Sequence, residues 1–190
     1  MSWKTHIEFM CAKANKLLGL VKRNCCDIYD NATRQLLYCS LVRPHLEYAS
    51  NVWSPYMAKY KELIQNIQRR ATKFILNYPS PDVNYKQRLM KLNLLPLEFR
   101  REINDLILLY KIRSETISFS SNLLIQSTSR YSTRNFDSTN YRPISHHTQD
   151  YYRQSYFPRT VTLWNSLPMD IKKANNILTF KKGTYYTLIN

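Results

Sequence analysis

Basic and polar residues recur at helical spacing between residues 65 and 73. Gln65, Arg69, Thr72 and Lys73 stand at i, i+4, i+7 and i+8, which places them on one side of a helix, and Arg70 lies beside them. A helix with such a face can lie along a phosphate backbone, where each cation releases condensed counterions. A solvated helix face explains the same pattern.

A second pair of cations, Arg100 and Arg101, is expected on the exposed flank of a later helix. The chain has 28 Lys plus Arg against 13 Asp plus Glu, a formal net charge of +15. Such a charge implies a polyanionic partner or a requirement for solubility. Nucleic acid is the commonest such partner, and an anionic membrane surface is the next candidate. The alternative is a basic, soluble protein without a polyanionic partner. Together these observations support two interpretations of the 65–73 helix face about equally: a surface that contacts phosphate and a solvated surface.

Cations and aromatic residues alternate between residues 130 and 159, in a segment rich in Ser and Thr. In such a segment Tyr and Phe can stack on unpaired bases while Arg contacts phosphate, at ~1–3 kcal/mol per stacked base. The alternative is a long arm that wraps its tyrosines against the helical body. The candidate binding residues of this arm are Arg130, Tyr131, Arg134, Arg142 and Arg153.

The residues that could support catalysis are few and scattered. Asp27 and Asp30 flank an expected loop and fit helix caps better than a pair of catalytic carboxylates. Two glycines in the whole chain argue against a phosphate-binding loop or a dinucleotide-binding turn. The spacing of the four cysteines and four histidines does not fit a zinc module. We therefore predict no catalytic residue, no metal site and no cofactor.

The cysteines are expected to be reduced thiols of an intracellular protein, in the nucleus or the cytoplasm. Lys4, Glu8 and Lys13 interrupt any apolar run near the start, so no signal peptide is expected. No stretch is apolar enough to suggest a membrane span.

Apolar periodicity predicts helices over residues 5–23, from a cap at Asp30 to Pro44, around residues 46–53, over 57–77, around 85–92, and from Pro96 to about 113. Pro44 is expected to end or kink its helix. The expected fold is mainly α: a helical bundle over residues 1–113, an extended basic and aromatic arm over 114–158, and a small C-terminal helical segment over 159–190.

The 57–77 helix is expected to bury a single stripe. The predicted buried residues are Tyr60, Leu63, Ile64, Ile67, Ala71, Phe74 and Ile75. The predicted opposite face carries Lys61, Gln65, Gln68, Arg69, Thr72 and Lys73.

Several strings of residues, in order along the chain, resemble one family. The most specific is Leu37-Tyr38-x-Ser40-Leu41-Val42-Arg43-Pro44-x-Leu46-Glu47-Tyr48-Ala49-Ser50-x-Val52-Trp53-Ser54-Pro55. It is followed by Gln65-x-x-Gln68-Arg69-Arg70-Ala71-Thr72-Lys73-Phe74-Ile75, by Tyr85-x-x-Arg88-Leu89-x-x-Leu92-x-Leu94-x-Pro96-Leu97-x-x-Arg100-Arg101, and by Trp164-Asn165-Ser166-Leu167-Pro168. These strings resemble the region past the last palm motif of non-LTR retrotransposon (LINE-type, jockey-like) reverse transcriptases.

The resemblance implies a thumb and a post-polymerase segment. A thumb is a helical bundle that grips the duplex of template RNA and primer behind the active site during target-primed reverse transcription. The catalytic palm and the endonuclease of such a polymerase are expected to lie outside this chain, so the resemblance supplies no catalytic residue. Some relatives carry a C-terminal zinc knuckle, which the Cys and His spacing excludes here. For the 65–73 helix, the resemblance implies a surface that contacts the duplex or RNA.

The expected partner is therefore RNA or an RNA–DNA duplex, without a membrane. Apolar surface that would have met the palm is expected to be exposed, with Trp3, Tyr48 or Trp53 on the patch and self-association as one outcome. The alternative is a non-enzymatic interaction or remnant protein with no role in nucleic-acid binding.

Overall fold

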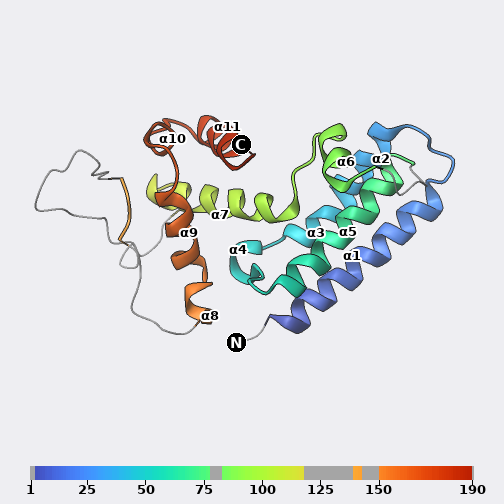
Figure 1. Ribbon diagram of the computed structural model, residues 1–190, viewed down its shortest axis with the longest axis horizontal. Helices are drawn as coiled ribbons and strands as arrows, with labels where there is room; N and C mark the ends of the chain where they lie inside the picture. Colours follow the sequence, from blue (N-terminus) through green and yellow to red (C-terminus); the bar gives the residue numbers. More distant parts are fainter. Residues whose placement is uncertain (1–2, 78–82, 118–138, 143–149, 190) are drawn as a thin grey trace, which may run out of the picture. The chain divides into compact units, whose positions relative to one another are not determined.

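The computed structural model describes residues 3–77, 83–117, 139–142 and 150–189. Its regular structure is helical, without a strand among these residues, which confirms the expected mainly α class (Figure 1). The chain divides into two compact units, Met1–Arg101 and Glu102–Asn190, and the division falls within helix α7 (Leu97–Arg113).

The first unit begins with a long helix, α1, and a capped helix, α2. α1 spans Lys4–Asn24 and buries the expected apolar stripe, including Ile7 and Leu18. α2 spans Asn31–Leu37, and the Asp30 carboxylate accepts hydrogen bonds from the backbone N–H groups of Ala32 and Thr33, at 3.3 and 2.8 Å. The predicted cap at Asp30 is confirmed.

Pro44 does not end its helix. The backbone widens into a π-helical turn, η1, over Tyr38–Val42, and continues as α3 (Arg43–Glu47) with Pro44 in its first turn. Because a proline ring clashes with the carbonyl four residues earlier, the wider turn lets the helix continue past Pro44. The short helix α4 (Ser50–Trp53) follows.

The longest remaining helix of this unit, α5 (Ala58–Ile75), contacts α1, α2 and α6 (Tyr85–Lys91). The core of the unit gathers apolar residues from α1, η1, α3, α5 and α6. Arg34 of α2 is also buried. Its guanidinium donates to the carbonyl of Phe74 at 3.0 Å and lies 4.9 Å from the Phe74 ring centre. A charged side chain at the C-terminal end of α5 compensates the carbonyls that lack helical partners there.

Trp53 belongs to this core and not to an exposed patch. It is 2% exposed, and its indole N–H donates to the carbonyl of Tyr48 at 2.7 Å. Tyr48 and Trp3 are 81% and 40% exposed. The expectation was therefore wrong for Trp53, and self-association stays a prediction for the surface that holds Tyr48 and Trp3.

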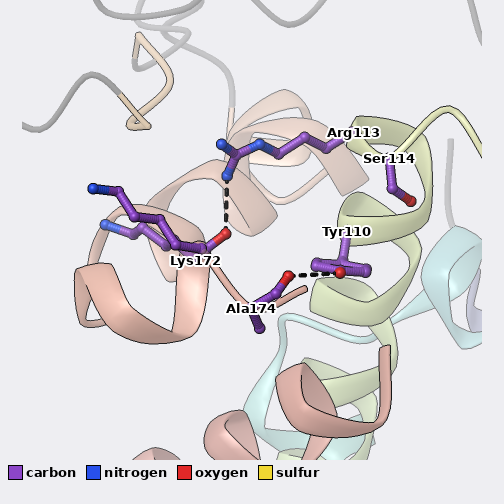
Figure 2. Close-up of a pocket in the computed structure, with 6 residues that line it drawn as sticks. Tyr110, Arg113, Ser114, Lys172 and Ala174 are labelled. Carbon is purple, nitrogen blue, oxygen red and sulfur yellow. Dashed lines mark hydrogen bonds between the residues drawn. The ribbon is translucent and has the colours of Figure 1, made fainter. Parts of the chain in front are cut away.

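The second unit contains the rest of α7, α8 (Asp150–Arg153), α9 (Tyr156–Asn165), α10 (Met169–Lys172) and α11 (Ile177–Ile189). Its core is aromatic: Trp164 is fully buried, and the rings of Tyr110 and Phe180 stack with centres 4.5 Å apart. Two contacts join α7 to the end of α10, from the Tyr110 hydroxyl to the Ala174 carbonyl at 2.8 Å and from Arg113 to the Lys172 carbonyl at 3.2 Å (Figure 2).

The predicted extended arm is only partly described. α7 ends at Arg113 as expected, but α8 and the first turn of α9 are helical within the 114–158 range that was expected to be extended. Two tyrosines of this range pack inward: Tyr141 is 5% exposed and the Tyr156 hydroxyl donates to the Asp105 carbonyl at 3.0 Å. For these two tyrosines the structure supports the alternative of an arm that packs its rings against the helices.

The two glycines of the chain differ in the space around their Cα atoms. A Cβ at Gly19 would meet only the flexible end of Arg23 at 3.6 Å, whereas a Cβ at Gly183 would lie 3.0 Å from Ile171. We expect Gly19→Ala to raise the free energy of unfolding by about 0.5–1 kcal/mol, because alanine is the better helix former. Gly183→Ala should give a smaller gain or a loss, because the new methyl group crowds Ile171. Urea denaturation followed by circular dichroism measures both, and equal gains would contradict the close packing at Gly183.

Candidate functional site

Helix α5 buries a wider face than its apolar stripe, because the buried face continues onto polar residues. Ile64, Ile67, Ala71 and Ile75 are fully buried, as predicted. Leu63, which was placed in the same stripe, is 37% exposed.

The prediction was also wrong for two polar residues of α5, because Gln68 and Thr72 are both 0% exposed. They face α6 and the turn after it: the Gln68 amide donates to the Leu95 carbonyl at 3.0 Å, and the Thr72 hydroxyl accepts from Arg88 Nε at 3.2 Å. Buried polar groups persist when they are hydrogen-bonded in this way.

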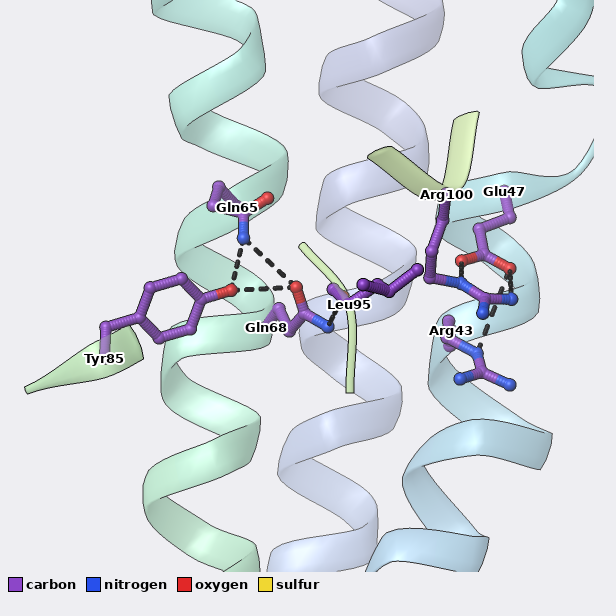
Figure 3. A network of polar contacts seen from close by, with 7 residues as sticks. All are labelled: Arg43, Glu47, Gln65, Gln68, Tyr85, Leu95 and Arg100. Atoms are coloured by element: carbon purple, nitrogen blue, oxygen red, sulfur yellow. Dashed lines mark hydrogen bonds and ion pairs between the residues drawn. The ribbon is translucent and has the colours of Figure 1, made fainter. Parts of the chain in front are cut away.

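Gln65 is drawn into the same polar contacts. Its amide N–H₂ donates to the Tyr85 hydroxyl, and the Tyr85 hydroxyl donates to the Gln68 side-chain oxygen at 2.8 Å (Figure 3). Gln65 is half-buried. Its side chain therefore holds α6 against α5 instead of projecting freely toward a partner.

Arg69 is partly exposed and has neighbours that orient it. Its guanidinium forms an ion pair with Glu62, donates to Asn66 at 3.1 Å, and lies 5.3 Å from the centre of the Tyr85 ring. Arg88 of α6 lies 5.7 Å from the same ring. Two cations therefore converge on Tyr85 from two different helices, and the contact of the partly exposed Arg69 is favourable by roughly 0.5–1 kcal/mol.

These side chains surround an open hollow of about 420 Å³. We call it the α5–α6 hollow. Arg70 and Lys73, both exposed, complete its basic rim, and none of the described lining residues is acidic. The lining residues are Asn66, Arg69, Arg70, Lys73, Val83, Asn84, Tyr85 and Arg88.

The basic surface continues from the hollow onto α1. Arg70 donates to the Asn15 side-chain oxygen at 2.6 Å. Partial burial and then the neighbouring Arg70 charge lower the pKa of Lys22, whose ammonium lies 6.0 Å from the Phe74 ring centre. Like charges that lower a lysine pKa in this way are stabilised when an anion approaches.

Arg88 is the basic lining residue of the hollow that the sequence-based site prediction missed; the same prediction also left out Tyr85. It lies three residues after Tyr85 on α6, but it is 5% exposed and α6 is separated from the 65–73 segment in sequence. Tyr85 and Arg88 both stand in the quoted motif string, and this was the signal in the sequence that could have identified Arg88.

The predicted cluster at Arg100 and Arg101 is not an exposed flank. Arg100 forms a two-bond ion pair with Glu47 of α3, with Nη2 and Oε2 2.9 Å apart, and Arg43 lies 3.9 Å from the same carboxylate (Figure 3). The hydrogen bonds with Glu47 raise the pKa of Arg100. Arg101 is 2% exposed. Arg100 is tied to α3 through Glu47 and Arg101 is buried in the first unit, neither of which helical periodicity alone reveals.

The remaining predicted residues lie elsewhere. Arg142 and Arg153 are exposed and belong to the second unit. Arg130, Tyr131 and Arg134 lie outside the described residues. Of the predicted set, the structure therefore brings together Gln65, Arg69, Arg70 and Lys73.

The described part of the chain holds no group of three or more potential metal ligands among His, Cys, Asp and Glu. Within the same residues, no helix has both the length and the apolar character needed to cross a membrane. All four cysteines are free, and burial raises the pKa of the Cys11 thiol to about 11, which makes it a poor nucleophile at neutral pH. Comparisons with protein-family models, with curated proteins and with solved structures find no match to this chain.

The Arg100–Glu47 pair gives a test of which cations are structural. Arg100→Ala should lower the free energy of unfolding by about 1–3 kcal/mol, because it leaves the Glu47 carboxylate, 14% exposed, without its two-bond partner. Lys73→Ala, on the exposed rim of the hollow, should change it by less than about 0.5 kcal/mol. Urea denaturation compares the two, and equal effects would contradict a structural role for Arg100.

Tyr85 predicts a dependence of stability on alkaline pH. Burial is the main cause that raises its pKa from 10.0 to about 12. A phenol whose pKa is higher in the folded state stabilises the fold fully below pH 10, and this contribution is lost as the pH rises toward 12. Tyr85→Phe should therefore cost about 1–2 kcal/mol at neutral pH through the lost hydrogen bonds, yet lose less stability between about pH 9 and about pH 11.5. Urea denaturation at the two pH values measures this, and parallel losses in the two proteins would contradict it.

Proposed function

We propose that this chain is the nucleic-acid-binding thumb and post-polymerase region of a non-LTR retrotransposon reverse transcriptase. In this proposal the chain grips the duplex of template RNA and primer, and the catalytic palm lies outside these residues. The observation that carries the proposal is the α5–α6 hollow, where Arg69, Arg70 and Lys73 of α5 meet Arg88 of α6.

The geometry of these cations suits a phosphate backbone. Residues three and four apart on a helix stand about 5–6 Å from each other, so Arg70 and Lys73 present two positive charges in one direction. Arg69 and Arg88 are oriented by Tyr85, which reduces the side-chain freedom that a bound partner would have to restrict. Contacts of this type position a nucleic acid without reading its bases.

The motif strings support the same proposal from the sequence. The segment from Gln65 to Lys73 and the segment from Tyr85 to Arg88, which resemble consecutive motifs of the family, are the two segments that form the hollow. A surface that two family-like motifs build together from separate helices is more informative than a single basic helix.

Binding to an RNA–DNA duplex tests the proposal. Fluorescence anisotropy at several salt concentrations should show an affinity that falls steeply with salt. Arg70→Ala with Lys73→Ala should weaken binding for all duplex sequences alike and reduce the slope of log K against log salt by about 2, because two phosphate contacts are lost.

A matched control separates the hollow from general charge. Lys13→Ala with Lys59→Ala also removes two positive charges, but from exposed positions outside the hollow. It should change the slope much less than the Arg70 and Lys73 pair. Equal effects of the two double variants would reject the hollow as the contact surface. No binding at low salt to RNA or to the duplex would reject the proposed function and favour the alternative of an interaction or remnant protein.

A further inference from the structure

A second basic pocket lies in the second unit, where the end of α7 meets the end of α10. It encloses about 210 Å³, and we call it the α7–α10 pocket. Three of its described lining residues are basic and none is acidic. The lining residues are Tyr110, Arg113, Ser114, Lys172, Lys173 and Ala174 (Figure 2).

The polar groups of this pocket leave hydrogen-bond donors for a ligand. The carbonyl of Ala174 accepts from the Tyr110 hydroxyl, and the carbonyl of Lys172 accepts from Arg113 Nη1, at 2.8 and 3.2 Å. A guanidinium carries five N–H donors, so the bond from Nη1 leaves most of the Arg113 fork available. Lys173 is exposed and lines the same pocket, so its flexible side chain can bring an ammonium group to a bound anion.

Three contacts hold Arg113 and Lys172 in place. The Arg113 guanidinium lies 5.4 Å from the centre of the Trp164 ring, which is fully buried. The Lys172 side chain is 4% exposed, and its ammonium donates to the Asn140 side-chain oxygen at 2.7 Å and to the Asn165 carbonyl at 3.1 Å. A charge buried beside the pocket acts on a ligand through a lower effective dielectric than an exposed one.

We infer that the α7–α10 pocket binds a phosphate group. The planar fork of Arg113 can donate two parallel hydrogen bonds to two phosphate oxygens, and Lys173 supplies a point charge on the solvent side. The Arg113 and Lys173 charges, with the buried Lys172 charge beside the pocket, match a group of up to two negative charges better than a single carboxylate. The inference does not rest on the proposed function, since it uses other residues in the other compact unit.

An NMR titration of the full chain with inorganic phosphate at low salt tests the inference. Saturable shifts are expected at the backbone amides of Arg113, Ser114 and residues 172–174. Lys173→Gln and Arg113→Gln should each raise the dissociation constant for phosphate by about tenfold, because each removes a charge-assisted contact. Lys181→Gln, at an exposed position of α11 outside the pocket, should leave it unchanged.

The outcomes separate clearly. The absence of saturable shifts, or a weakening by Lys181→Gln equal to that by Lys173→Gln, overturns the inference. If Arg113→Gln disturbs the packing on Trp164, the exposed Lys173→Gln variant still decides the result.

A second titration, with a short single-stranded RNA, identifies the source of the phosphate group. Shifts at the same amides that Lys173→Gln weakens assign a phosphodiester of a polynucleotide. Shifts there with inorganic phosphate alone assign a small phosphate compound. If RNA shifts only residues of the α5–α6 hollow and phosphate shifts none, the pocket is rejected while the proposed function stands. The variant that combines Arg70→Ala with Lys73→Ala should lose duplex binding and still bind inorganic phosphate at the α7–α10 pocket.

Discussion

Helix α5 contacts α1, α2 and α6, and the width of its buried face constrains the rest of the first unit. One edge of this face contains Gln68 and Thr72, whose polar groups have no access to water. A buried amide or hydroxyl without a partner costs about 1–3 kcal/mol, so α6 and the turn at Leu95 must supply partners. They do so through Tyr85, Arg88 and the Leu95 carbonyl. The position of α6, and with it the α5–α6 hollow, follows from this requirement.

The same constraint divides the cations into two groups. Arg34, Arg100 and Arg159 are held inside their units by a carbonyl, by Glu47 and by Asp105. Their charge contributes to the net value of +15, but each guanidinium is bonded to a partner within the fold. Arg70 and Lys73 remain exposed at the rim of the hollow. The surface that can meet a polyanion is therefore smaller than the composition suggests, and its position is set by hydrogen bonds in the core.

In the second unit, aromatic packing has the role that buried amides have in the first. Trp164, Phe180 and Tyr110 stack, and Arg113 lies against the indole. This packing holds the Arg113 guanidinium at the α7–α10 pocket, with one bond to the Lys172 carbonyl. Both units thus orient an arginine on an aromatic ring, Tyr85 in one and Trp164 in the other, next to a hollow lined by cations.

The sequence by itself determined the mainly α class, the approximate bounds of α1, α5 and α7, the cap at Asp30, and the buried stripe of Ile64, Ile67, Ala71 and Ile75. These features depend on neighbours within a few residues, which periodicity and capping rules report directly. Only the tertiary structure decided that Gln68, Thr72 and Arg101 are buried, that Arg100 pairs with Glu47, 53 residues away, and that Arg88 joins the hollow. Periodicity reports where apolar residues recur along one helix. It does not report a face buried by polar residues, because their hydrogen-bond partners come from elements that are distant in sequence.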